Sequence, residues 1–336
     1  MWFKEFIVSL QPKCLSEENM KKITIPQWLD KIIFDDFGAV YEPRPTEVVY
    51  NPDQPYDFVK LYLGTYFPRS YSEAYGIISQ LLSLDNFVNH FNGLEEINIL
   101  DFCCGTGGEI IGTIVALQSQ LPSLKRVNVD AFDANADAVR FLYHLIETIN
   151  NVEEIKVKIN INPQCIYIES EQEIQDIVNM TNGQYHFMMS FKAINEFVQH
   201  ETFEANAYEL VASHFFPLLS QYGVFIMTDV TTPLDDNRKL YYPQMMNLGL
   251  NNYIRKSSHY KSIIPAACFN HETICSGCFM QDIFYVTHRR KVNDISKVAY
   301  RVVAKSELAN EIMCHNTIKA CRATTPMADK NLPYNN

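Results

Sequence analysis

The stretch INILDFCCGTGGEIIG, Ile97–Gly112, decides the fold of this chain of 336 residues. A short apolar run typical of a strand ends at Asp101, two cysteines and a glycine-rich loop follow, and a helical pattern begins behind them. Glycines let the backbone turn sharply and let a ligand approach without a Cβ in the way. The N-terminus of the following helix attracts anions. The stretch is therefore interpreted as a metal site, a nucleotide cradle or a tight turn in a core.

The spacing of the glycines separates these alternatives. A phosphate-binding P-loop needs a lysine after its last glycine, and none follows here. A dinucleotide fingerprint needs a third glycine where Ile110 stands, which disfavours a nicotinamide oxidoreductase. Cys103 and Cys104 are adjacent, whereas zinc-binding pairs usually stand two to four residues apart, so we expect them to be small packing residues.

Strands and helices alternate after residue 96. Apolar runs predict strands at 97–102, 126–132, 156–161 with 165–168 as an extension, 185–191 and 223–230. Helical patterns separate most of them, among them 136–149 and about 202–219. The runs 282–288 and 297–305 predict a closing antiparallel pair. This order predicts an α/β fold, a Rossmann-like, doubly wound, mainly parallel sheet of seven strands with an antiparallel edge and a helical N-terminal extension. Ligands then bind at the carboxyl ends of the strands.

The same pattern divides the chain into three parts. Residues 1–95 are expected to be a helical extension or lid, because they show helical spacing and loop interruptions. Residues 96–306 form the ligand-binding domain, with an insertion at about 257–280 that contains cysteine and histidine. Residues 307–336 form a C-terminal tail.

Composition narrows the partners and the location. The net charge is −11, which disfavours nucleic acid as a partner because broad nucleic-acid binding needs clustered positive charge. No apolar run approaches the roughly 20 residues of a membrane-spanning helix. The first residues make a poor signal peptide, and nine cysteines are an odd number, so we expect free thiols or metal ligands in a cytoplasmic protein. The oligomeric state is left open.

A second acid independently supports the interpretation of the glycine loop as a nucleotide cradle. The second predicted strand ends in AFDANADAV, which places Asp133 directly before a helix. A carboxylate there can accept hydrogen bonds from both hydroxyls of a ribose. Asp130, in the middle of the same strand, is the alternative. The acid and glycines of the first stretch, together with Asp133, resemble the motifs of the class I S-adenosylmethionine (SAM) dependent methyltransferases.

That resemblance covers about residues 60–305 and implies a methyltransferase whose cofactor is S-adenosyl-L-methionine and whose methyl acceptor is unidentified. In the family the glycine loop cradles the methionine part of SAM, and a segment like HFMMSFKAINEFV lines the active site. A third-strand acid that contacts adenine would be Glu169 or Glu171. By position, the expected cofactor-binding residues are Asp101, Cys103, Gly105, Thr106, Gly107, Asp133, Ala134, Glu169, Phe191 and Asn195. The candidate general bases are Glu196 and His200.

A cluster of cysteines and a histidine suggests a second site. Zinc and iron–sulfur clusters prefer such ligands, and the candidates are Cys268, His271, Cys275 and Cys278. Reduced thiols in a loop are the alternative. The motif Pro265-x-x-Cys268-x-x-His271-x-x-x-Cys275 resembles the mitochondrial small-ribosomal-subunit methyltransferase-like family. This implies a second hypothesis, a non-catalytic, ribosome-linked binding or assembly factor that keeps the methyltransferase fold.

Seven aromatic residues crowd the segment YDFVKLYLGTYFPRSYSEAYG, residues 56–76. They predict either a helical flank packed on the sheet or a lid over SAM and its acceptor, with Tyr66, Arg69 and Tyr71 at the mouth. A lid would exclude water, and aromatic faces attract a sulfonium cation.

Overall fold

The computed structural model describes residues 21–43, 55–181, 183–235, 240–269 and 281–316. Its first half contains β1 (Lys22–Thr24), α1 (Gln27–Lys31), η2 (Ile32–Asp36), α2 (Pro55–Thr65), α3 (Phe67–Leu82), α4 (Asp85–Val88), η3 (Asn89–Phe91), β2 (Glu96–Phe102), α5 (Gly108–Gln120), β3 (Arg126–Asp133), α6 (Ala136–Ile149) and β4 (Lys158–Cys165). Its second half contains α7 (Glu171–Met180), β5 (Tyr185–Phe191), α8 (Ile194–Gln199), α9 (Ala207–Phe215), η4 (Phe216–Leu218), β6 (Leu219–Val230), β7 (Pro233–Asp235), β8 (Leu240–Tyr241), α10 (Tyr242–Ser257), β9 (Tyr260–Ile264), α11 (Ala266–Phe269), β10 (Asp282–His288), β11 (Lys291–Lys305) and α12 (Ser306–Ile312).

The main sheet has the order β1-β10-β11-β6-β5-β2-β3-β4 within the described chain, and β9 also pairs with β11. Strands β4, β3, β2, β5 and β6 are parallel, whereas β11 runs antiparallel to both β6 and β10. The parallel part follows the strand order of a doubly wound sheet. In such a sheet the strands are added first on one side of the first strand, here β2, and then on its other side. The predicted fold class is confirmed, and β1 and β9 add to the seven predicted strands.

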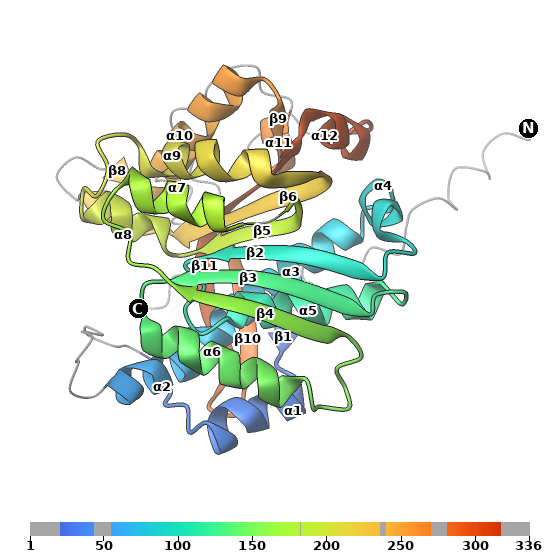
Figure 1. Cartoon of the computed structure of the whole chain (residues 1–336), viewed down its shortest axis with the longest axis vertical. Helices are drawn as coiled ribbons and strands as arrows, with labels where there is room; N and C mark the ends of the chain where they lie inside the picture. The colour runs from blue at the N-terminus through green and yellow to red at the C-terminus, as the bar shows by residue number, and fades with distance from the viewer. Residues whose placement is uncertain (1–20, 44–54, 182, 236–239, 270–280, 317–336) are drawn as a thin grey trace, which may run out of the picture.

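Helices cover both faces of the sheet, and the strand sequences show why. Ile97 and Ile99 of β2 belong to the apolar core under α3, α5 and α6. Leu100 and Phe102 of the same strand belong to the core under α7, α9 and α10. A parallel strand buried on both faces reads as a nearly continuous apolar run, as β2 does. Figure 1 shows α9 and α10 on one side of the strands and α6 and α2 on the other.

Helix α3 packs unusually close to α5, the helix behind the glycine loop. Two glycines of α5, one turn apart, permit this contact. A Cβ at Gly108 would lie 2.5 Å from the Phe67 carbonyl oxygen, and a Cβ at Gly112 would overlap the carbonyl oxygen of Tyr71. The N-terminal helices are thereby fixed against the element that shapes the ligand site.

The structure adds elements that the sequence patterns did not reveal. The first 95 residues were expected to be helical, but Lys22–Thr24 pairs in parallel with Tyr285–Thr287 of β10. Helices α7 and α10 were not predicted, since both carry many polar residues, which lower the mean hydropathy of these segments. None of the helices in the described ranges is long and apolar enough to cross a membrane.

Candidate functional site

A cavity of about 840 Å³ opens at the carboxyl ends of β2, β3 and β5. Its volume lies in the upper part of the range of roughly 300–1,000 Å³ that small-molecule sites occupy. The lining comes from the glycine loop, the ends of β3, β4 and β5, helix α8 and the helices α2 and α3. This position, beside the reversal of strand order at β2, is where doubly wound sheets bind their ligands.

The glycine loop turns through three residues with positive φ. Cys103, Gly105 and Gly107 have φ values of 66°, 49° and 79°. A Cβ at Gly105 would have no atom within 4 Å, so the loop leaves open space on its cavity side. Gly107 caps α5, and a Cβ there would strike Leu142 of α6. The loop therefore needs glycine for its backbone conformation, for packing and for access to the cavity.

Asp133 stands at the end of β3 and lines the same cavity. Its carboxylate accepts hydrogen bonds from the backbone N–H groups of Gly105 (2.7 Å) and Asn135 (2.8 Å). Burial raises the pKa of Asp133, and these N–H groups act in the opposite direction. A carboxylate offers about four lone-pair positions, so acceptor capacity is left for the hydroxyls of a ligand.

Asp101 lies beneath the loop instead of in the cavity wall. It is 0% exposed, and neither of its oxygens has a hydrogen-bond partner. Burial, with the nearby carboxyls of Glu109 and Asp133, raises the pKa of Asp101 well above its usual range. Glu109 does line the cavity, and burial raises its pKa to about 8 although Lys192 opposes the shift. These two acids therefore favour their neutral forms near pH 7.

The segment after β5 is anchored from β6. Asp229, at the end of β6, accepts hydrogen bonds from the hydroxyl of Tyr208 (2.8 Å) and the backbone N–H of Asn195 (3.0 Å). With its amide oriented to satisfy both neighbours, the Asn195 side chain also donates to Asp229 (2.7 Å). Burial raises the pKa of Asp229 to about 7. This network fixes the start of α8, which carries Asn195 and Glu196 into the cavity wall.

Lys192 joins this segment to α3 and β11. It has a φ of 56°, and its ammonium contacts the carboxylate of Glu73 at 2.8 Å. Glu73 is 0% exposed and also accepts a hydrogen bond from the hydroxyl of Ser296 on β11. The single lysine among the lining residues is therefore neutralised by a buried partner.

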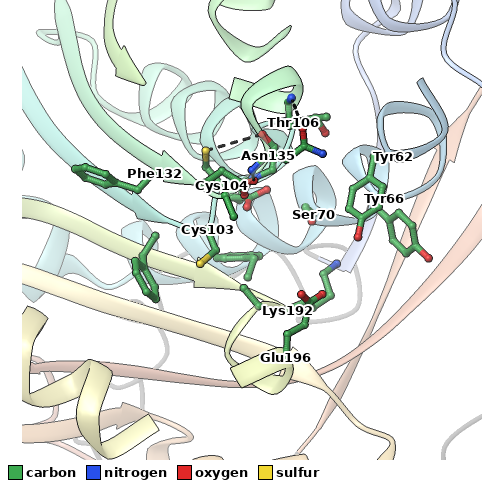
Figure 2. A pocket seen from close by; sticks show the side chains of 18 of the residues that line it. Tyr62, Tyr66, Ser70, Cys103, Cys104, Thr106, Phe132, Asn135, Lys192 and Glu196 are labelled. Carbon is green, nitrogen blue, oxygen red and sulfur yellow. Dashed lines mark hydrogen bonds between the residues drawn. The ribbon is translucent and has the colours of Figure 1, made fainter. Parts of the chain in front are cut away.

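Aromatic side chains of the N-terminal helices cover the cavity. Phe58, Tyr62 and Tyr66 line it, and their rings follow one another at centroid distances of 4.8 and 4.7 Å. Figure 2 shows Tyr62 and Tyr66 beside Lys192 and Glu196, apart from the glycine loop. The other residues expected at the mouth lie elsewhere: Arg69 forms an ion pair with Asp294 (2.8 Å), and Tyr71 is buried. Of the three residues named for the mouth, Tyr66 alone is among the described lining residues, and the lid remains a prediction.

Most residues predicted for the site meet at this cavity. The lining includes Cys103, Gly105, Thr106, Asp133, Ala134, Phe191, Asn195, Glu196 and His200. Asp101, Gly107 and Glu169 are not among the lining residues; Glu169 leads into the capped start of α7. Sequence reasoning missed Tyr62 and the segment Ile166–Ile168, where Tyr167 is 69% exposed. The apolar run Ile166–Ile168 was visible as an extension of the third strand, but nothing in it marked a cavity wall.

The predicted metal cluster largely falls outside the described residues. Cys268 lies in α11, whereas His271, Cys275 and Cys278 belong to residues 270–280, which the structure does not describe. No group of three or more potential metal ligands occurs among the residues that are described. The cluster remains a prediction.

Comparisons with known proteins were made by sequence and by structure. No protein-family profile and no curated protein matches the sequence. Among solved structures, a SAM dependent methyltransferase from Aquifex aeolicus is 12% identical, with 69% of this chain and 97% of that chain covered and a TM-score of 0.33. The rRNA methyltransferase aviRa from Streptomyces viridochromogenes is 9% identical, with 72% and 86% covered and a TM-score of 0.35. The plantazolicin methyltransferase BpumL is 14% identical, with 82% and 94% covered and a TM-score of 0.34.

At such identities and TM-scores the matches describe a likeness only. The strand order and the antiparallel β11 show a Rossmann-like, doubly wound α/β fold with an antiparallel edge. Fold alone does not fix function, so the acceptor and the reaction have to be argued from the cavity.

Proposed function

We propose that the protein is a SAM-dependent methyltransferase. One observation carries this proposal: the glycine loop and Asp133 line a single cavity at the reversal point of the sheet. The loop offers open space above Gly105 for the methionine part of SAM, and the Asp133 carboxylate has acceptor capacity for the ribose hydroxyls. The segment Ile166–Ile168 after β4 would lie along the adenine.

The cofactor supplies the reactive methyl group, so the chain itself mainly has to position an acceptor and exclude water. Helix α2 contributes the aromatic cover, and the anchored start of α8 contributes Glu196 and His200 at the cavity wall. Either side chain could remove a proton from an acceptor that needs deprotonation. The acceptor itself is a separate question.

Calorimetric titration of the purified full chain with SAM and with S-adenosylhomocysteine (SAH) tests the proposal. We expect both to bind in one-to-one stoichiometry. If neither SAM nor SAH bound, the cofactor assignment would be refuted. A labelled-methyl screen over small molecules, proteins and RNA then tests the enzymatic half, and a protein that binds SAM but labels no acceptor class would contradict it.

A further inference from the structure

The charges around the cavity are unequal. The carboxyl groups of Glu109, Asp133 and Glu196 belong to the described lining, and no arginine does. Glu109 favours its neutral form near pH 7, so the negative charge comes from Asp133 and Glu196. Lys192 is the only lysine there, and its charge is compensated by the buried Glu73. An acceptor carrying phosphate or carboxylate at its reacting end would meet like charges and no unpaired lysine or arginine.

Asp133 and Glu196 come from different elements of the cavity wall, although they lie close enough for Asp133, after burial, to raise the pKa of Glu196. Asp133 is held at the glycine loop by the backbone of Gly105 and Asn135, where the proposed function places the ribose. Glu196 projects from α8 on the side of Tyr62 and Tyr66 (Figure 2). After burial itself, Glu196 is the largest cause that raises the pKa of the Tyr62 hydroxyl, and Asp133 contributes less, so Glu196 is the acid that acts most strongly on Tyr62. Glu196 is thus left over once the cofactor's contacts are assigned.

The cover around Glu196 is aromatic. Phe58, Tyr62 and Tyr66 stand four residues apart on one side of α2 and at its end, and all three line the cavity. Aromatic faces joined to a carboxylate are a standard arrangement for holding an ammonium group, because the ring quadrupole and the charge both attract a cation. Rings of this size also favour an apolar body beside the charge.

We propose that the methyl acceptor is a small amine with an apolar body, held by Phe58, Tyr62 and Tyr66 with its nitrogen at Glu196. This inference rests on the proposed function, since it assigns the acceptor end of the same cavity. It excludes a phosphate-rich acceptor group from the reacting position.

The chemistry balances with SAM as the methyl donor. The ammonium form gives one proton to the Glu196 carboxylate, which leaves a lone pair on nitrogen. That lone pair attacks the methyl carbon of SAM, and the carbon–sulfur bond breaks with its electron pair remaining on sulfur, so the sulfonium becomes the neutral thioether SAH. The product is a methylated ammonium ion, and Glu196 returns its proton to water. Glu196 suits this role because burial raises its pKa, which makes the carboxylate a stronger base.

Binding of matched probes to the SAH-saturated full chain tests the inference. The probes are 2-phenylethylamine, 3-phenylpropionate and phenyl phosphate, measured by calorimetry at equal ionic strength. We expect the amine to bind at least tenfold more tightly than either anion, and SAM in place of SAH to yield the N-methylated amine by mass spectrometry. Equal or tighter binding of an anion, or no binding of the amine to SAH-saturated protein, would overturn the inference.

Variants at α8 separate this proposal from the cofactor assignment. Glu196→Gln should lose about tenfold in affinity for the amine while SAH binds as before, and Glu196→Asp should keep the preference for the amine. Glu201→Gln is the matched control, because Glu201 is exposed close by and does not line the cavity. Normal amine binding by Glu196→Gln would refute the acceptor assignment alone, whereas failure of wild-type protein to bind SAH would refute the proposed function.

Discussion

The carboxylate of Asp133 receives two backbone N–H groups and still faces the cavity. Asp133→Ala would remove the acceptor for the ribose hydroxyls, and a hydrogen bond to a charged group is worth about 1.5–3 kcal/mol. We therefore expect SAH binding to weaken about 10- to 100-fold in calorimetry. Asp130→Asn is the control, because Asp130 of the same strand accepts from Tyr185 (2.6 Å) and does not line the cavity. Equal losses in both variants would show that the ribose assignment is wrong.

The ionisation of Asp229 makes the free energy of unfolding depend on pH. Burial raises its pKa to about 7, above the value near 3.9 expected in the unfolded chain. The folded state therefore holds a proton that the unfolded state releases, so this contribution to stability is complete below about pH 4 and is lost as pH rises through 7. We expect the free energy of unfolding to fall less steeply between pH 5 and 8 in Asp229→Asn than in wild type.

Denaturant titrations across that pH range measure the difference in slope, which amounts to at most about 1.4 kcal/mol per pH unit for one proton. Glu109, with a pKa of about 8, acts in the same direction in both proteins and does not blur the comparison. Glu204→Gln, at an exposed acid, should retain the wild-type slope. Identical slopes for Asp229→Asn and wild type would refute the role given to Asp229.

The residue types in the sequence predicted many of the residues that line the cavity, but not the reaction that takes place there. Asp133 and the glycines could be predicted as site residues, because an acid and glycines with positive φ at strand ends are typical of a ligand-binding loop. Tyr62 and Tyr167 could not be singled out, because an aromatic residue in a helix or after a strand is equally typical of a core. The position of Asp101 beneath the loop depends on how far β2 extends before the loop begins. The spacing of residues in the sequence does not show this.

At the scale of elements, the contact between α3 and α5 depends on glycine. Gly112→Ala would place a Cβ against the Tyr71 carbonyl oxygen. Overpacking costs about 1–3 kcal/mol, which should outweigh the roughly 1 kcal/mol that alanine gains over glycine within a helix. We expect a lower midpoint in denaturant unfolding. Gly183→Ala, where a Cβ would meet nothing within 4 Å, should be nearly neutral, and a stabilised Gly112→Ala would contradict the packing described.

Elements with strong periodicity were predicted well, whereas polar or short ones were not. Strand β2 and helix α6 match their predicted spans within a residue or two, because burial imposes a clear period on each. Helix α9 (Ala207–Phe215) is shorter than the predicted 202–219, since an Asn206 side-chain cap starts it and Phe216–Leu218 continues as η4. Strand β1, with three residues, is stabilised by its neighbour β10 and carries too little pattern to predict.

At the scale of the whole molecule, the N-terminal helices and the sheet share one core. Leu29, Ile33, Ile77 and Leu81 lie in the same apolar cluster as the strands β2 and β3. A fragment beginning at Glu96 would expose the face of α5 that α3 covers. We expect such a fragment to lack cooperative thermal unfolding, measured by near-ultraviolet circular dichroism. A fragment that unfolds at the temperature of the full chain would show that residues 1–95 are a dispensable extension.

The pairing of β1 with a strand near the C-terminus also affects the chain while it is being synthesised. The pairing with β10 begins with Lys22 opposite Tyr285, and β11, which joins β10 to the parallel strands, ends only at Lys305. At a synthesis rate of about 5–20 residues per second, ribosomes need roughly 10–50 s to add the intervening residues. Throughout that interval the apolar sides of α1 and α3 lack part of their final covering. The N-terminal helices should therefore be protected by chaperones during translation.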